Sequence, residues 1–129
     1  MKTRSGIRIE KCTVYESTGR RKRVVYNAEG TLHGVDYCVL SAKSKQEAEQ
    51  QALAEVAFAK SNPPISIDGF SLRPLGDNGF SLRFPDGGGY LFGATSRAAA
   101  LERLASEYDA DHPVQSFLRD ATLVVRGEA

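Results

Sequence analysis

The pentapeptide GFSLR occurs twice, at residues 69–73 and again at residues 79–83. The LGDNG segment that joins the two copies is rich in Gly, Asn and Asp, which tolerate tight turns and positive φ. This arrangement predicts a β-hairpin closed through a five-residue loop, with Leu72 opposite Leu82 and Phe70 opposite Phe84.

Side chains alternate between the two faces of a strand, so the hairpin sorts the repeated residues by chemistry. The predicted buried face holds Phe70, Leu72, Phe80, Leu82 and Phe84. The predicted outer face holds Ser71, Arg73, Ser81 and Arg83. Two explanations of the repeat stay open: each strand needs an F-x-L motif to fill one core, or the Ser and Arg face uses the same binding chemistry twice.

Two segments show the pattern of helices. In SKQEAEQQALAEVAFAK, Ser44 and Glu47 are spaced as a capping box, and the prolines of SNPP stop the helix. We predict a helix over 44–60, with Leu53 and Val56 buried. A second helix is predicted over 96–108, begun by Thr95 or Ser96 and packed through Leu101 and Leu104.

Strand-like segments rich in β-branched and aromatic residues precede both helices. They cover residues 6–17, 24–30 and 34–41 before the first helix, and 65–73, 79–84 and 89–94 before the second. The tail predicts a short helix near 114–118 and a last strand at ATLVVR, residues 121–126. The predicted fold class is therefore α+β: two tandem βββα units at 1–62 and 63–129, each an antiparallel sheet on one helix. One continuous α+β sheet is the alternative.

Charge is distributed unevenly along the chain. Residues 1–30 hold eight Lys or Arg and three Glu, a net charge of +5, whereas residues 65–129 hold six Arg and nine Asp or Glu, a net charge of −3. The densest basic cluster is Arg20, Arg21, Lys22 and Arg23. It favours phosphate contact, because Lys and Arg displace the counterions condensed on nucleic acid; a solvated turn is the alternative.

Several classes of protein are disfavoured. Two cysteines make neither a disulfide framework nor a four-ligand metal site. Asp109, Asp111 and His112 are too few for a divalent-ion site, DGGGY lacks the Lys-Ser/Thr of a P-loop, and no Ser, His and Asp arrangement stands out. We therefore expect no enzyme activity and no cofactor. The N-terminus has no apolar signal-peptide region and no apolar run approaches a membrane span, so we expect a cytoplasmic protein without a membrane partner.

The segment GFSLRPLGDNGFSLRFPDGGGYLFGATSRAAALERLASEY resembles the DNA-binding domain of plant ethylene-response factors. It is also similar to the Arm-binding domains of phage-type tyrosine recombinases. The resemblance implies a three-stranded antiparallel sheet packed on one helix, with the outer sheet face in the major groove and Arg73 and Arg83 as DNA-contacting residues. SAKSKQEAEQQALAEV likewise resembles the end of a recombinase Arm-binding domain, and the last helix of double-stranded-RNA-binding domains.

Three functions follow as expectations. The first is a small nucleic-acid-binding accessory or regulatory protein of a phage or other mobile element, with binding centred on residues 20–23 and with Arg73 and Arg83 secondary. The second is a non-enzymatic, protein-binding inhibitor from a mobile element, such as an anti-CRISPR-type protein, whose partner has an acidic surface. The third is an oligomerisation domain whose exposed strand edges pair between chains.

Overall fold

The computed structural model describes residues 1–15 and 22–128 of the chain, which divides into two compact units, Met1–Lys60 and Ser61–Ala129. Each unit has a sheet of its own, and both sheets are antiparallel. The architecture is therefore α+β, as predicted, and it is built from two separate sheets.

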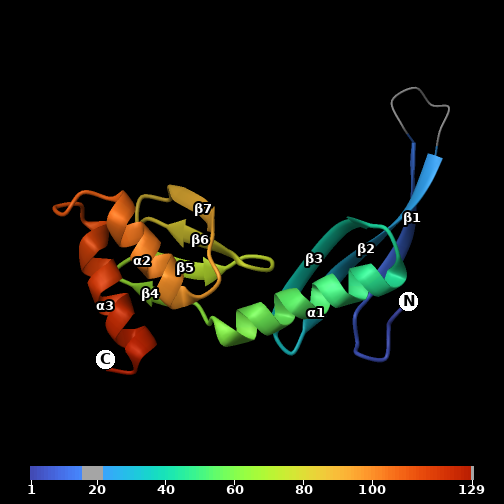
Figure 1. Ribbon diagram of the computed structural model, residues 1–129, viewed down its shortest axis with the longest axis horizontal. Helices are drawn as coiled ribbons and strands as arrows, with labels where there is room; N and C mark the ends of the chain where they lie inside the picture. Colours follow the sequence, from blue (N-terminus) through green and yellow to red (C-terminus); the bar gives the residue numbers. More distant parts are fainter. Residues whose placement is uncertain (16–21, 129) are drawn as a thin grey trace. The chain divides into compact units, whose positions relative to one another are not determined.

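The first unit is a three-stranded sheet followed by a helix. The strands β1 (Ile9–Tyr15), β2 (Lys22–Leu32) and β3 (Val35–Ala42) lie in that order, and α1 (Lys45–Ser61) runs across one face (Figure 1). Apolar residues of the sheet meet the small residues of α1 in one core. Its buried members are Ile7, Ile9, Ala28, Tyr37, Val39, Ala42, Ala48, Ala52 and Val56.

The predicted helix over 44–60 is confirmed, with a variation at its start. The backbone N–H of Glu47 donates to Ser44 Oγ at 3.1 Å, as in a capping box. The Glu47 carboxylate reaches one residue further back than expected and accepts from the Lys43 N–H at 2.6 Å. The first contact satisfies a backbone donor in the first turn of α1, and the second satisfies a donor just before the helix begins.

The second unit is a four-stranded sheet with two helices. The strands are β4 (Ile65–Ile67), β5 (Phe70–Pro74), β6 (Gly79–Arg83) and β7 (Gly89–Gly93), in chain order. The helices α2 (Arg97–Glu107) and α3 (Val114–Arg126) cover one face of this sheet (Figure 1). Ring contacts tie the layers together: Phe70 of β5 stacks on Phe117 of α3 with centroids 5.6 Å apart.

The prediction of a βββα pattern for the second unit is wrong, because the segment 65–73 is two strands instead of one. Asp68 and Gly69 have φ of 52° and 85°, so the chain reverses between them. Asp-Gly is a preferred pair for a two-residue hairpin turn, in which both residues have positive φ. The turn folds β4 back onto β5, with Ile65 opposite Leu72.

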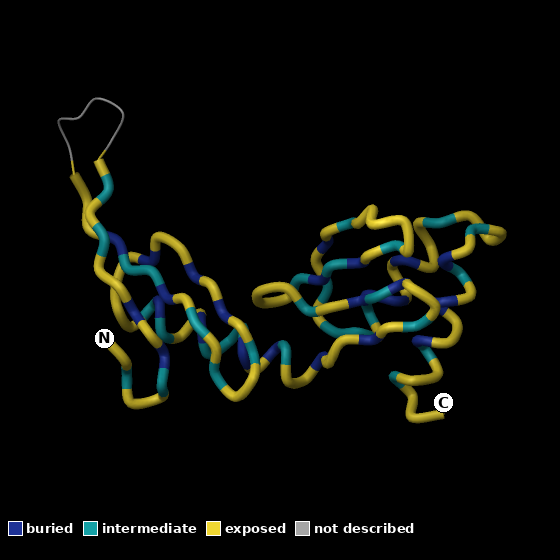
Figure 2. Tube along the Cα trace, turned by 180° about the vertical axis from the view of Figure 1, so that it is seen from behind, coloured by how far each residue is buried: buried dark blue, intermediate teal, exposed yellow. Residues whose placement is uncertain are grey.

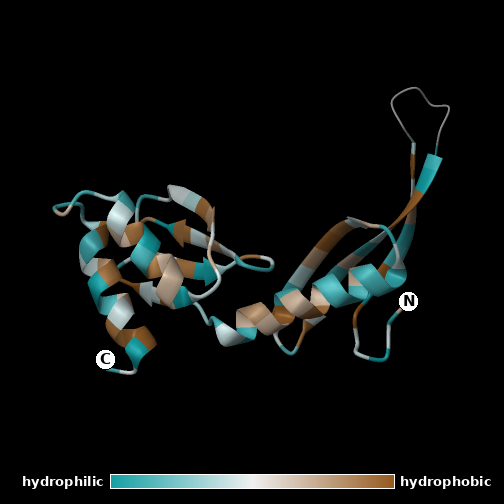
Figure 3. Cartoon of the chain, in the orientation of Figure 1, coloured by the Kyte–Doolittle hydropathy of each residue, from teal (hydrophilic) through white to brown (hydrophobic). Residues whose placement is uncertain are grey.

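The predicted C-terminal strand is also wrong. Residues 121–126 belong to the single helix α3, which ends at Gly127 in the left-handed conformation with φ of 72°. The Thr and Val residues of this segment have high strand propensity, but propensity yields to burial at helical spacing. Figure 3 shows the resulting mixture of polar and apolar bands along α3. Its buried residues are Val114, Phe117, Leu118 and Ala121.

The predicted GFSLR hairpin is confirmed. Leu72 lies opposite Leu82, and the rings of Phe70 and Phe84 are 5.9 Å apart. Buried and less buried positions alternate along β5 and β6, as Figure 2 shows. Of the five residues predicted to be buried, Phe84 alone is only half-buried. The predicted core residues Val56, Leu101 and Leu104 are buried, and Leu53 packs half-buried against the first core.

Asn62 connects the segment before β4 to the start of α2. Its side chain is 6% exposed, and its Oδ1 accepts from the backbone N–H of Arg97 at 2.9 Å. Ser96 caps the same helix by accepting from the Ala99 N–H at 3.1 Å. The SNPP segment therefore ends one helix and also satisfies a donor at the start of the next.

We expect Asn62→Ala to lower the free energy of unfolding by about 1–3 kcal/mol, because it leaves the part-buried backbone N–H of Arg97 without its acceptor. Asn62→Asp is the matched control, since it keeps the accepting oxygen and places a negative charge near a helix N-terminus. Chemical denaturation measures both variants. Equal stability of Asn62→Ala and the unmodified protein would contradict the role given to this side chain.

Among the described residues, no helix is long and apolar enough to cross a membrane. Cys12 and Cys38, which lie in β1 and β3, are both free.

Candidate nucleic-acid interface

The sheet of the second unit separates charge from apolar side chains. Its four strands, all of which the structure describes, contain only two charged residues, Arg73 and Arg83. Both arginines are exposed, and both lie on the face opposite α2 and α3. The nine acidic residues of residues 65–129 all lie in turns, in helices or in the segments beside them. A unit with a negative net charge therefore presents one face whose strands carry only positive charge.

The strand register places the two arginines close together on this outer face. Arg73 lies opposite Ser81, and Arg83 lies opposite Ser71, so the arginines are diagonal neighbours. Diagonal neighbours in an antiparallel pair are about 7–8 Å apart. The rows continue to Ser66 in β4 and to Gly89 and Leu91 in β7. We call this set the Ser/Arg face: Ser66, Ser71, Arg73, Ser81, Arg83, Gly89 and Leu91.

Neither arginine of the Ser/Arg face forms an ion pair with a residue that the structure describes. The positions directly across from the two arginines carry short residues: Ser81 lies across from Arg73, and Ser71 and Gly89 lie across from Arg83. Arginine presents five N–H donors in a planar fork that matches phosphate and base edges. Two such forks above a low, hydroxyl-bearing surface are free to bind an external anion.

Arg103, on the opposite side of the sheet, differs from Arg73 and Arg83 because its guanidinium group contacts other residues of the same unit. Its Nε donates to Glu107 at 2.8 Å, its Nη1 donates to the Gly93 carbonyl at 2.8 Å, and its guanidinium lies over the Phe92 ring at 5.4 Å. The hydrogen bond with Glu107 is the main cause that raises the pKa of Arg103 above its ordinary value. Arg103 therefore links α2 to β7, whereas Arg73 and Arg83 have no such internal role.

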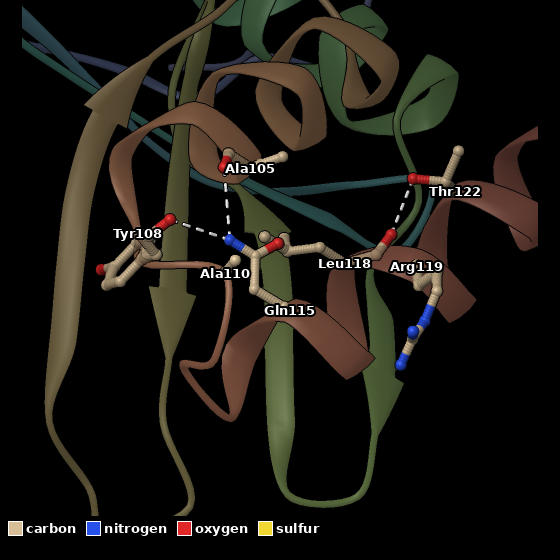
Figure 4. Close-up of a pocket in the computed structure, with 7 residues that line it drawn as sticks. All are labelled: Ala105, Tyr108, Ala110, Gln115, Leu118, Arg119 and Thr122. Carbon is tan, nitrogen blue, oxygen red and sulfur yellow. Dashed lines mark hydrogen bonds between the residues drawn. The ribbon is translucent and has the colours of Figure 1, made fainter.

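On the helical side of the unit, side chains donate hydrogen bonds to backbone carbonyl groups of the two helices and the loop between them. Figure 4 shows the Gln115 amide between the two helices, where it donates to the carbonyls of Ala105 at 3.2 Å and Tyr108 at 3.0 Å. Thr122 donates to the Leu118 carbonyl at 2.7 Å. The hollow around these groups is about 440 Å³ and contains one arginine, Arg119, at its edge. These contacts position α3 against α2.

The basic cluster predicted in the first unit is only partly described. Arg20 and Arg21 lie outside the described residues. Lys22 and Arg23 are exposed at the start of β2, opposite Tyr15 and Val14 of β1. Consecutive strand residues point to opposite faces, so Lys22 and Arg23 do not share one surface.

The outer face of the first sheet is mixed in charge. A hollow there of about 390 Å³ is lined by Arg8, Glu10, Asn27, Glu29 and Leu40, together with Gly30. Arg8 pairs with Glu10 at 3.6 Å, which leaves the second carboxylate without a compensating cation in this lining. Phosphate would meet net negative charge at this hollow, so it is the poorer candidate of the two sheet faces.

Sequence reasoning identified Arg73, Arg83, Ser71 and Ser81, and the structure brings these four residues together. It missed Ser66 and Leu91 of the same face. The Asp-Gly pair after Ile67 was the available signal for Ser66, because it marks β4 as a separate strand. The alternation in GYLFG was the signal for Leu91, which is 65% exposed.

No protein-family model, curated protein or solved structure matches this chain. The first unit nevertheless has the three-stranded antiparallel sheet followed by a helix that the resemblance implied, and β5, β6, β7 and α2 follow the same order in the second unit.

Proposed function

We propose that this chain is a non-enzymatic, nucleic-acid-binding accessory or regulatory protein whose principal interface is the Ser/Arg face of the second unit. One observation carries the proposal: the only charged residues in four strands are two exposed arginines, on one face, without an internal partner. Arginine forks bind phosphate oxygens and can donate in pairs to guanine in the major groove.

The form of the surface favours a groove of duplex nucleic acid. The major groove of B-DNA admits a two-stranded β-ribbon, and the β5–β6 hairpin carries both arginines. Serine hydroxyls at Ser71 and Ser81 add donors to phosphate or base edges without blocking a close approach. In this proposal Lys22 and Arg23 of the first unit contribute further phosphate contacts.

The proposal is tested by fluorescence anisotropy with labelled DNA and RNA duplexes at two salt concentrations. We expect association at low salt that weakens as salt rises, because bound arginines release condensed counterions. DNA bound more tightly than RNA would agree with reading through the major groove, since the major groove of RNA duplexes is too deep and narrow for side chains. A complete lack of association at low salt would remove the nucleic-acid function.

A second candidate function, binding of a protein with an acidic surface, is favoured by Leu75 and Leu91. These leucines are 52% and 65% exposed, and Leu91 lies in the same row of the sheet as Arg73. Arginine is enriched at protein interfaces, and the buried core of an interface is more apolar than its rim. A pull-down from a native host with nuclease present would recover the partner in this case, and the same arginines would meet carboxylates.

A further inference from the structure

The second unit contains a hollow at one end of its sheet that the proposed nucleic-acid function does not use. It lies between the β6–β7 turn and the loop from α2 to α3, and it has a volume of about 480 Å³. Small-molecule pockets typically span about 300–1,000 Å³. Its lining is Phe70, Phe84, Pro85, Asp86, His112 and Pro113.

The walls of this hollow are rings set at angles to one another. Phe84 meets Phe70 edge to face, with an interplanar angle of 77°, and its centroid lies 6.2 Å from that of His112. Tyr108 packs behind them, 4.9 Å from His112 and 6.1 Å from Phe84. Two prolines complete the apolar lining, so rings from separate segments line one open hollow.

One hydrogen bond and one ring contact hold these walls in place. His112 Nδ1 accepts from the Val114 N–H at 3.0 Å, and Phe70 is stacked on Phe117. Because Nδ1 is an acceptor, the neutral imidazole carries its proton on Nε2. These contacts fix the positions of His112 and Phe70 in the wall of the hollow.

Asp86 supplies the only charge in the described lining of the hollow. Its Oδ1 accepts from the Gly88 N–H at 2.8 Å, whereas its Oδ2 accepts from no described residue. The loop that carries His112 also carries Asp109 and Asp111, which adds negative potential nearby. The described residues contain no group of three His, Cys, Asp or Glu that could hold a metal ion.

We infer that this hollow binds an organic ammonium group, either quaternary or methylated. The negative faces of aromatic rings attract a cation within about 6 Å of their centroids, and a carboxylate at the rim strengthens that attraction. An anion is disfavoured, because no Lys or Arg lines the hollow. A neutral apolar ligand would contact the rings but would gain nothing from the negative charge of Asp86.

The charge requirement is tested with choline and its uncharged analogue 3,3-dimethylbutan-1-ol, which has nearly the same shape. NMR titration of the ring signals of Phe84 and His112 gives both affinities. We expect choline to bind more tightly by about 2- to 30-fold, the range that corresponds to a cation–π contribution of about 0.5–2 kcal/mol. Equal affinity of the two probes, or no shift with either, would overturn the inference.

Variants separate the carboxylate from the rings. Asp86→Asn keeps the oxygen that accepts from Gly88 and removes the charge, so it should weaken choline and leave the alcohol unchanged. Asp77→Asn, in the β5–β6 turn, is the matched control and should change neither affinity. Loss of choline affinity in both variants would show a long-range effect of net charge and contradict a site at Asp86.

The ammonium group could belong to a free small molecule or to a methylated lysine side chain. A titration with N-acetyl-trimethyllysine amide distinguishes these sources. Tighter binding of this probe than of choline identifies a side-chain ligand, and tighter binding of choline identifies a free one. Neither measurement depends on nucleic acid, so this inference and the proposed function can fail separately.

Discussion

Leu104→Ala is expected to lower the free energy of unfolding of the second unit by about 2–5 kcal/mol. Leu104 is fully buried on α2, the helix that covers the inner face of the second sheet. The truncation removes apolar contacts and leaves a cavity that close-packed surroundings fill only in part. Chemical denaturation followed by circular dichroism measures the loss.

Leu75→Ala is the matched control for this prediction. Leu75 lies in the β5–β6 turn of the same unit and is 52% exposed, so the same truncation should change stability by about 0.5 kcal/mol or less. Similar unfolding curves for Leu104→Ala and Leu75→Ala would contradict the packing of the Leu104 side of α2 against the sheet.

The double variant Arg73→Ala with Arg83→Ala is expected to bind duplex DNA roughly 100-fold more weakly at about 50 mM salt. Each phosphate contact adds about 0.9 to the slope of log affinity against log salt, and about 1.3 decades separate 50 mM from 1 M salt. Two lost contacts therefore remove about two decades of affinity, and the salt slope should fall by about 1.8. Stability should stay within about 0.5 kcal/mol, because both side chains are exposed.

The control variant Arg119→Ala with Arg126→Ala removes the same charge from α3. Both arginines are exposed on the helix that covers the opposite face of the sheet. This control should keep most of the affinity and most of the salt slope. Equal losses in the two double variants would mean that net charge, and not the Ser/Arg face, controls binding.

Local patterns predicted the parts of the fold that local physics determines. The register of the GFSLR hairpin follows from the two-residue alternation of side chains along its strands and from the single turn that joins them. The bounds of α1 follow from Ser44, Glu47 and the prolines after the helix. The short helix predicted near 114–118 is the first part of α3, but its continuation over 121–126 was predicted as a strand because Thr122, Val124 and Val125 favour strands in isolation. Their neighbours Phe117, Leu118 and Ala121 favour a helix only once a sheet face is present to bury them.

The Ser/Arg face and the hollow also differ in how far the sequence could predict them. The Ser/Arg face could be predicted because alternation along two adjacent strands decides which side chains share a surface. The hollow between Phe70, Phe84 and His112 could not, because its walls come from three segments that only the tertiary structure brings together. The additional strand β4 was not predicted because the Asp-Gly turn lies within residues 65–73, a segment whose other residues have the pattern of a single strand.

Binding of nucleic acid at the Ser/Arg face is tested most directly by an NMR titration of the arginine side-chain Nε–Hε signals with duplex DNA at low salt. We expect the signals of Arg73 and Arg83 to shift or broaden first, together with the backbone signals of β5, β6 and β7. The signals of Arg119 and Arg126 serve as internal references and should move little. Perturbation confined to these two helical arginines, with Arg73 and Arg83 unchanged at saturating DNA, would contradict binding at the Ser/Arg face.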